Sequence, residues 1–227
     1  MKKFIISPPF GNWIDSKKFT SVLGSFTWKA RPGLLKHALK TFRPYEGGWI
    51  NKIGLRNKGI RSIPYFEDRF IYSVVGLEDD DWERILYYIP PNTNVEVNLG
   101  CPNVHEYGIP PSIMKDYCTK FNVIAKLSPD ENIKETAAMC IEAGVQKLHV
   151  SNTLSDPNGK GGISGRRLFR MNLDNVYVLS QKYPGKIIAG GGIYDKHVLR
   201  AYEWAGATNF SLSTVWLTPW RVRSIIS

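Results

Sequence analysis

The chain has 227 residues, 43% of them hydrophobic, and a formal net charge of +10. That length and apolar content allow one large folded domain over residues 1–227, because no charged or Pro/Ser-rich linker divides the sequence. No apolar run reaches the roughly 18 residues that a membrane-spanning helix needs, and no signal-peptide core follows the first residues. We therefore expect a cytoplasmic protein without a membrane partner.

Cysteine and histidine residues are scattered along the chain rather than clustered. The three cysteines lack paired spacing, which argues against a disulfide framework and against a cysteine-rich zinc site. The four histidines lack the spacing of metal ligands, so we assign no metal and expect each histidine at the surface or in packing. The excess of Lys and Arg favours an anionic ligand, whose identity the composition leaves open.

Eight short β-like segments follow one another along the chain, each ending in small, polar or glycine-rich residues. They cover residues 5–7, 20–26, 70–75, 94–99, 123–127, 147–151, 186–189 and 208–212. Helical periodicity between them is clearest at 78–88, 132–143 and 195–205. Strands that alternate with helices are parallel, so eight of them predict an α/β fold of the (β/α)8 TIM-barrel class, compact and with shortened loops. The alternative, an open doubly wound sheet, lacks the expected Gly-x-Gly-x-x-Gly after its first strand.

The segment 94–103 is the most informative part of the sequence. Valines alternate with polar residues in the manner of a strand, which then ends in a Gly-Cys-Pro-Asn turn. Core packing does not require Asn98, Cys101 and Asn103 at this place, and in a parallel barrel the chemistry lies at the carboxyl ends of the strands. A lone cysteine is more often a small buried hydrophobe, so this interpretation depends on the other strand ends.

Polar residues recur at the ends of the later strands, as one shared ligand would require. They are Lys126 in strand five, Ser151-Asn152-Thr153 after strand six, the glycines at 190–192 after strand seven, and Ser213-Thr214 after strand eight. Lys126 lies in an otherwise apolar strand, so its ammonium needs either a carboxylate such as Glu96 or an electron-rich cofactor atom. The glycine triplet and Ser213-Thr214 together indicate a phosphate site, because many barrels bind phosphate after strands seven and eight.

Taken in chain order, these segments resemble the dihydroorotate dehydrogenase family of flavin-dependent (β/α)8 barrels. The similar stretches are Gly-Ser-Phe-Thr at 24–27, Ile-Asn-Lys-Ile-Gly-Leu-Arg-Asn at 50–57, Asn-Leu-Gly-Cys-Pro-Asn at 98–103, Ala-Lys-Leu-Ser-Pro at 125–129, Ser-Asn-Thr at 151–153, Gly-Gly-Ile-Ser-Gly-Arg at 161–166 and Ile-Ala-Gly-Gly-Gly-Ile at 188–193. The resemblance implies an FMN-dependent oxidoreductase acting on CH–CH bonds, which converts dihydroorotate to orotate in pyrimidine biosynthesis.

The resemblance also implies a role for each matching residue. Cys101 would remove the C5 proton of the substrate while hydride leaves C6 for flavin N5. The implied substrate-binding residues are Asn51, Gly54, Leu55, Asn98, Asn103, Asn152 and Thr153. The implied FMN-binding residues are Gly24, Ser25, Asn98, Lys126, Ser151, Gly165, Gly191, Gly192, Ser213 and Thr214, with Lys126 near the flavin N1/O2 edge. Amides can pair with a pyrimidine edge, and a flavin can carry the hydride that no side chain can.

Two other functions remain open on the sequence alone. The tRNA dihydrouridine synthases share Asn-x-Gly-Cys-Pro on a flavin barrel, and the basic charge suits RNA. Residues 151–153 and 161–166 instead match the dehydrogenases, so we expect a small pyrimidine substrate and no nucleic acid partner. The second alternative is a non-catalytic flavin-binding barrel. The family and the seven tryptophans further suggest a homodimer.

Overall fold

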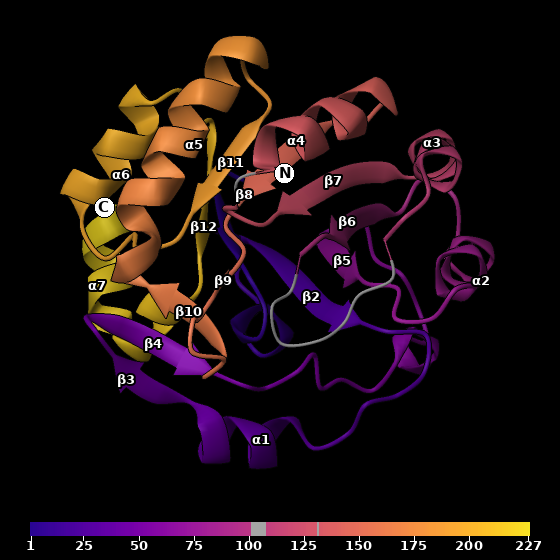
Figure 1. Ribbon diagram of the computed structural model, residues 1–227, viewed down its shortest axis with the longest axis horizontal. Coiled ribbons are helices and arrows are strands. Elements are labelled where there is room, and N and C mark those ends of the chain that lie inside the picture. The colour runs from indigo at the N-terminus through magenta and orange to yellow at the C-terminus, as the bar shows by residue number, and fades with distance from the viewer. Residues whose placement is uncertain (101–107, 131) are drawn as a thin grey trace.

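In the computed structural model, which describes residues 1–100, 108–130 and 132–227, eight parallel strands close into a barrel (Figure 1). In spatial order the strands are β1 (Phe4–Ile6), β12 (Asn209–Leu212), β11 (Ile187–Gly190), β8 (Lys147–Val150), β7 (Asn122–Leu127), β6 (Asn94–Asn98), β5 (Phe70–Val74) and β2 (Thr20–Phe26). Each expected strand coincides with a barrel strand to within one residue at either end. The predicted (β/α)8 class is confirmed.

Six helices of the described chain follow barrel strands and cover the outside of the barrel (Figure 1). They are α2 (Asp81–Tyr88), α3 (Pro111–Lys120), α4 (Ile133–Glu142), α5 (Phe169–Lys182), α6 (Lys196–Trp204) and α7 (Pro219–Ile226). The main core lies between helices and strands, and its largest buried side chains include Trp82, Tyr117 and Tyr202. No helix within the described residues is long and apolar enough to cross a bilayer.

A small antiparallel sheet lies outside the barrel, and the strand periodicity of the sequence does not predict it. Its strands, in spatial order, are β3 (Arg43–Tyr45), β4 (Gly48–Asn51), β10 (Gly162–Gly165) and β9 (Leu154–Ser155). Asn51 on β4 lies opposite Gly162 on β10. The sheet therefore joins the segment that follows β2 to the segment that follows β8.

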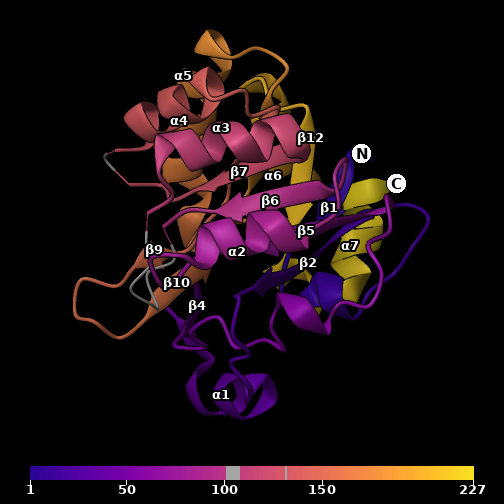
Figure 2. The ribbon, with the colours of Figure 1, turned by 90° about the vertical axis from the view of Figure 1, so that its right-hand side faces the viewer.

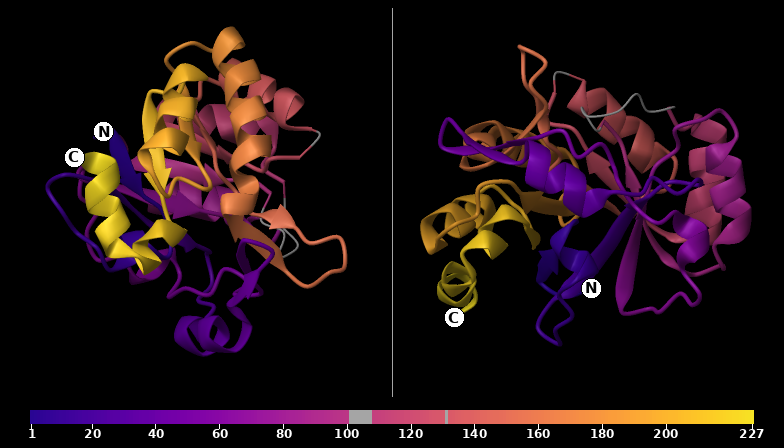
Figure 3. Two further views of the ribbon diagram at one scale, coloured as in Figure 1. Left: turned by 90° about the vertical axis from the view of Figure 1, so that its left-hand side faces the viewer. Right: turned by 90° about the horizontal axis from the view of Figure 1, so that it is seen from below.

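Helix α1 (Leu34–Thr41) contacts β4 and does not belong to the outer ring of helices. Figure 2 shows α1 projecting below the barrel, and the view from below in Figure 3 places it in front of the strands. The remaining turns include four 3-10 helices, at Phe10–Asn12, Ile60–Ser62, Arg166–Leu168 and Thr214–Leu217. Strand β1 is followed by the first of these instead of by an α-helix.

Side chains that point into the barrel form two layers of opposite polarity. The apolar layer consists of Ile5, Val22, Ile71, Ile124 and Ile188. Because side chains alternate along a strand, the positions two residues further on also point inward. There the same strands carry Ser7, Gly24, Ser73, Lys126 and Gly190. Glu96 lies opposite Ser73, and His149 lies opposite Lys126, so both belong to this polar layer.

Candidate active site

A cavity of about 490 Å³ opens where the barrel strands end. The ends of β2, β6 and β7 contribute Gly24, Asn98 and Lys126, and the segment after β8 contributes Asn152 and Thr153. A smaller recess of about 80 Å³ adjoins this cavity and shares Lys126 and Thr153 with it. The carboxyl end of the barrel therefore holds one large space with a narrow extension.

The described residues that the sequence analysis selected all line these two spaces. Those on the larger cavity are Gly24, Ser25, Asn51, Gly54, Leu55, Asn98, Lys126, Asn152, Thr153, Ser213 and Thr214. Those on the smaller recess are Lys126, Ser151, Thr153, Gly165, Gly191, Gly192, Ser213 and Thr214. The other two selected residues, Cys101 and Asn103, lie outside the described residues. The roles of all these residues stay predictions.

Two buried asparagines face the larger cavity and are held by hydrogen bonds at both ends of their amide groups. Asn98 Nδ2 donates to Ser25 Oγ at 3.0 Å. Asn152 Nδ2 donates to Asn98 Oδ1 at 2.8 Å and to the Leu99 carbonyl at 3.0 Å. The backbone N–H of Thr153 donates to Asn152 Oδ1 at 3.0 Å. Because both amides are fixed, they present donors and acceptors to a ligand in a defined arrangement.

Glu96 and His149 form a hydrogen-bonded pair inside the barrel. Glu96 Oε2 lies 2.7 Å from His149 Nδ1, and both side chains are 1% exposed. Burial by itself would raise the pKa of the Glu96 carboxyl, but the charges of His149 and Lys126 and hydrogen bonds from His149 and Ser73 lower this pKa overall. His149, for which the sequence suggested a surface or packing role, is therefore the buried partner of a carboxylate.

Lys126 projects from β7 into both spaces and is only partly buried. The sequence left two partners open for it, a neighbouring carboxylate or a cofactor. Glu96 pairs with His149, and within the described part of the chain no ion pair joins Glu96 to Lys126. Among the described residues no carboxylate forms an ion pair with the Lys126 ammonium, which favours an anionic or electron-rich ligand in the cavity that it faces.

Loops after β8, β11 and β12 build the small recess. Gly191 and Gly192 have φ values of 86° and 78°, which favour glycine. A Cβ atom at Gly191 would lie 2.6 Å from Asn172 Nδ2, so the loop also requires glycine for space. Ser213 and Thr214 lie at the start of the 3-10 helix after β12. Backbone N–H groups and hydroxyls in such a recess suit a phosphate group.

Sequence reasoning missed the apolar wall of the larger cavity. Its members come from the segment after β1, from α1 and from the last 3-10 helix, and they are Phe10, Trp13, Leu34, Ala38, Leu39, Phe42 and Leu217. Leu34 and Ala38 are four residues apart in α1, so helical spacing within 34–41 was an available signal. Asn12 supports this wall, because its side chain makes two hydrogen bonds to the backbone of Gly24.

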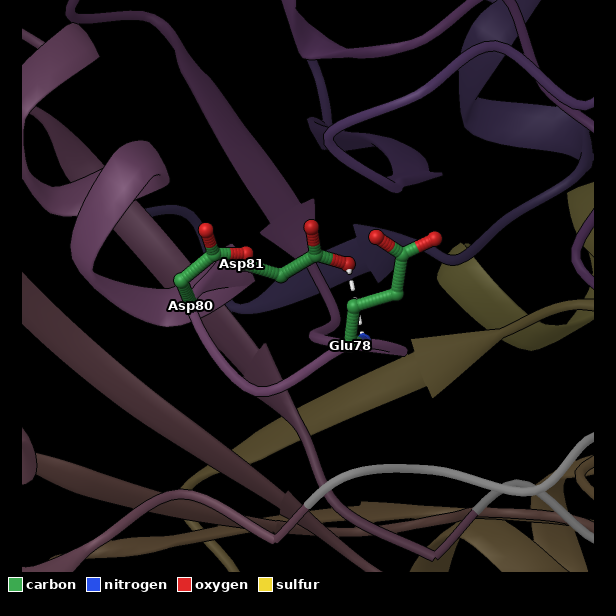
Figure 4. A group of neighbouring side chains, drawn as sticks. All are labelled: Glu78, Asp80 and Asp81. Carbon is green, nitrogen blue, oxygen red and sulfur yellow. Dashed lines mark hydrogen bonds between the residues drawn. The ribbon is translucent and has the colours of Figure 1, made fainter.

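One group of carboxylates in the described chain is compact enough to share a cation, namely Glu78, Asp80 and Asp81 (Figure 4). Glu78 accepts a hydrogen bond from Lys29 Nζ at 2.7 Å, and Asp80 pairs with Arg84. Asp81 Oδ2 accepts the backbone N–H of Glu78 at 3.1 Å. Because protein cations already occupy two of the three carboxylates, we assign no metal to this group.

The fold and the cavity define a class of protein. Characterised (β/α)8 enzymes have their active sites at the carboxyl ends of the barrel strands, where this chain gathers its buried amides, its lysine and its glycine loops. The geometry therefore indicates an enzyme-type barrel whose ligand carries an anionic group.

Comparisons with known proteins identify the family. A family model described as dihydroorotate dehydrogenase matches residues 9–227. Relatives from Bacillus mycoides and Bacillus thuringiensis, both named "Dihydroorotate dehydrogenase B (NAD(+)), catalytic subunit", are 31% identical over 230 residues. The matches cover 86% of this chain and 74% of each relative. The chain belongs to the dihydroorotate dehydrogenase family.

A solved structure supports the fold independently. The crystal structure of a ligand-free dihydroorotate dehydrogenase (DHODH) from Eimeria tenella superposes on this chain with a TM-score of 0.71 and 18% sequence identity. The superposition covers 98% of this chain and 82% of that one. The barrel that the motifs indicated is therefore confirmed, and the family model and the Bacillus relatives confirm the family and the oxidoreductase class. Members of this family are generally flavin-dependent.

Proposed function

We propose that this chain oxidises dihydroorotate to orotate in pyrimidine biosynthesis, with FMN as its cofactor and Cys101 as its base. The main support is convergence: the two fixed asparagines, the Lys126 ammonium and the glycine recess all open on connected spaces. The sizes fit as well, because a recess of about 80 Å³ suits a phosphate and a cavity of about 490 Å³ suits a planar ring beside a small substrate.

The described residues fit the flavin cofactor by their chemistry. Residues Gly165, Gly191, Gly192, Ser213 and Thr214 would hold its phosphate, and Gly24, Ser25, Asn98 and Ser151 would line its remaining length. Bound flavin supplies hydride acceptance, which no side chain offers. Lys126 would stabilise negative charge on the electron-rich edge of the bound ring, since a fixed cation in a partly dry site acts strongly on such charge.

The substrate side of the proposal uses amides and a thiol. Asn51, Asn98, Asn103 and Asn152 pair with the alternating donors and acceptors of a pyrimidine carboxylate, and Gly54, Leu55 and Thr153 complete its site. Cys101 removes the C5 proton as a thiolate, a form that nearby positive charge favours. For Cys101 and Asn103 the support is the sequence motif, because both lie outside the described residues.

An anaerobic titration with dihydroorotate tests this function. Purified protein should be yellow with bound FMN, and dihydroorotate should bleach the flavin. Cys101→Ala should slow bleaching by roughly 10²- to 10⁴-fold while FMN stays bound, because general bases contribute on that order. Cys118→Ala is the matched control, since burial raises the pKa of its thiol to about 11 and leaves it unreactive.

Three results would overturn the proposal. A colourless protein that ignores added FMN would exclude a flavoenzyme. A yellow protein that dihydroorotate does not bleach, but that forms dihydrouridine in unmodified tRNA with NADPH, would favour the tRNA-modifying alternative. A yellow protein inert to both substrates would favour the non-catalytic flavin-binding barrel.

The partners and the location of the chain remain proposals. The Bacillus relatives are named as catalytic subunits, so we propose that this chain too can work beside a second subunit, in the cytoplasm. A homodimer is the other assembly that the sequence suggested. Sedimentation of the purified chain separates a monomer from a dimer, and purification from its native cell tests for a second subunit.

A further inference from the structure

Three cationic side chains line the larger cavity, and no carboxylate lines it within the described residues. The three are Arg43, Arg56 and Lys126. A cavity wall that carries positive charge without acidic side chains favours an anionic ligand. The three cations differ in what else they contact, and this difference indicates which of them can bind the anion.

Two of these three cations have other roles. Arg43 Nη1 donates to the carbonyls of Leu39 at 2.8 Å and Phe42 at 2.7 Å, at the C-terminal end of α1, where a cation is favourable. Lys126 also lines the smaller recess, and the proposed function places it at the flavin. Of the three side chains, Arg56 has neither role.

The Arg56 side chain has no hydrogen-bond or ion-pair partner among the described residues. Its Nε is buried without a hydrogen bond, and none of the ion pairs in the described chain includes its guanidinium. The residue as a whole is only partly buried and borders the larger cavity. A guanidinium carries several N–H donors in a planar fork, and leaving them unpaired away from water is unfavourable. A carboxylate in the cavity would accept more than one of these donors at once.

The loop that carries Arg56 is held by hydrogen bonds on both sides of this residue. Asn57 Nδ2 donates to the Leu55 carbonyl at 2.7 Å, and the backbone of Asn57 exchanges two hydrogen bonds of 2.8 Å with Arg31. Arg31 Nε donates to the Gly54 carbonyl at 3.3 Å. Gly54 and Leu55 have φ values of 68° and 52°, and this left-handed conformation is strained for leucine, so the surroundings must hold the turn in shape. A fixed backbone lowers the entropy cost of binding a ligand through Arg56.

We propose that Arg56 is a substrate-binding residue whose guanidinium binds the carboxylate of the substrate. For the identity of that substrate the inference rests on the proposed function. Asn51, Asn98 and Asn152 line the same cavity and can pair with the ring, but their neutral amides do not compensate the charge of a carboxylate. Arg56 supplies this charge, and its planar fork matches both oxygens of a carboxylate. The arginine therefore selects an acidic pyrimidine over a neutral one.

Two ligands that differ in charge test the inference in the flavin-loaded protein. Orotate carries the carboxylate, whereas its methyl ester keeps the ring and is neutral. Arg56→Gln should weaken orotate binding by about tenfold to hundredfold, as expected when a hydrogen bond to a charged group is lost. It should leave the affinity for the ester nearly unchanged. Arg56→Lys keeps the charge without the fork, so it should recover part of the orotate affinity. Isothermal titration calorimetry measures these affinities.

Arg61→Gln is the matched control, because it removes the same charge from a nearby turn. Arg61 lies in the 3-10 helix Ile60–Ser62, its guanidinium carbon is 4.9 Å from the centroid of the Trp28 ring, and it lines neither space. Orotate affinity should therefore stay at the wild-type value. An equal loss in Arg61→Gln would show that net charge alone matters. A loss in Arg43→Gln with none in Arg56→Gln would assign the carboxylate to the other arginine, and either result would overturn the inference.

The binding data and the bleaching experiment separate this inference from the proposed function. Wild-type orotate affinity in folded Arg56→Gln would overturn the inference and leave the proposed function intact. If Arg56→Gln does not fold, Arg56→Lys decides, and wild-type orotate affinity in that variant would overturn the inference. A protein that binds orotate through Arg56, but whose flavin dihydroorotate does not bleach, would overturn the proposed function alone. A wild-type protein that binds neither ligand would overturn both.

Discussion

The apolar layer and the polar layer inside the barrel lie on the same strands, only two residues apart. Ile71 and Ser73 on β5, or Ile124 and Lys126 on β7, are separated by about 7 Å of strand. The apolar layer stabilises the barrel by burial and close packing, which tolerate no charge. In the polar layer, hydrogen bonds, among them that of the Glu96–His149 pair, offset the cost of removing polar groups from water. On these strands, the residue that stabilises the barrel and the residue that belongs to the ligand-binding layer therefore lie only two positions apart.

Removing one partner of the buried pair should have the largest effect on stability. His149→Ala leaves the Glu96 carboxylate buried without its hydrogen-bond partner, so the free energy of unfolding should fall by about 3–5 kcal/mol. Urea denaturation followed by circular dichroism measures this loss. The double variant Glu96→Leu/His149→Leu should recover most of it, because two apolar side chains need no partners. A double variant as unstable as His149→Ala would show that the site stabilises the barrel by packing rather than by charge.

The contribution of Glu96 should also depend on pH. Because the folded structure lowers the pKa of this carboxyl below its ordinary value of 4.5, its stabilising effect is complete above that value. It is lost as the pH falls through the lower pKa of the folded state. The stability difference between the wild type and Glu96→Gln should therefore be constant near neutral pH and shrink under acid conditions. A difference that stays constant down to the acid transition would contradict this assignment.

A substitution in the apolar layer should cost less and leave the site intact. Ile71→Val removes one methylene group, so the free energy of unfolding should fall by about 0.5–1.5 kcal/mol. Orotate affinity should stay at the wild-type value, since Ile71 lies one layer away from the cavity residues. Loss of affinity together with stability would mean that the two layers are mechanically coupled.

An ion pair at the surface should contribute least. Arg84 pairs with Asp80 one turn earlier in α2, and both side chains are partly exposed. Arg84→Gln should lower the free energy of unfolding by about 0.3–0.5 kcal/mol, and high salt should remove even this difference. A loss comparable with that of His149→Ala would remove the distinction between buried and exposed pairs.

Local patterns were sufficient to predict the barrel and most residues of the site. Strand alternation and glycine or proline turns located the eight strands, and parallel closure placed their polar ends together without any knowledge of side-chain contacts. Lys126 and Asn98 were found in this way, because each interrupts an apolar strand near its carboxyl end.

The remaining features depend on contacts between distant parts of the chain. The central pairing of the outer sheet joins Asn51 on β4 to Gly162 on β10, two strands that lie far apart in the sequence. The sequence offered Lys126 as a partner for Glu96, but the register of three neighbouring strands brings His149 to it. A histidine between apolar residues at an inward position of β8 was the available signal, and only the closed barrel shows which carboxylate it meets.

The pairing of β1 with β12 has a consequence for how the protein is made. Phe4 lies opposite Phe210, and the hydroxyls of Ser7 and Ser211 hydrogen-bond across the same seam. Of the eight barrel strands, β1 comes first in the sequence and β12 last, so β1 must wait for β12 before this edge is covered. Such long-range closure slows folding and leaves two open sheet edges during synthesis. We expect the nascent chain to engage chaperones until the segment around Leu212 has emerged.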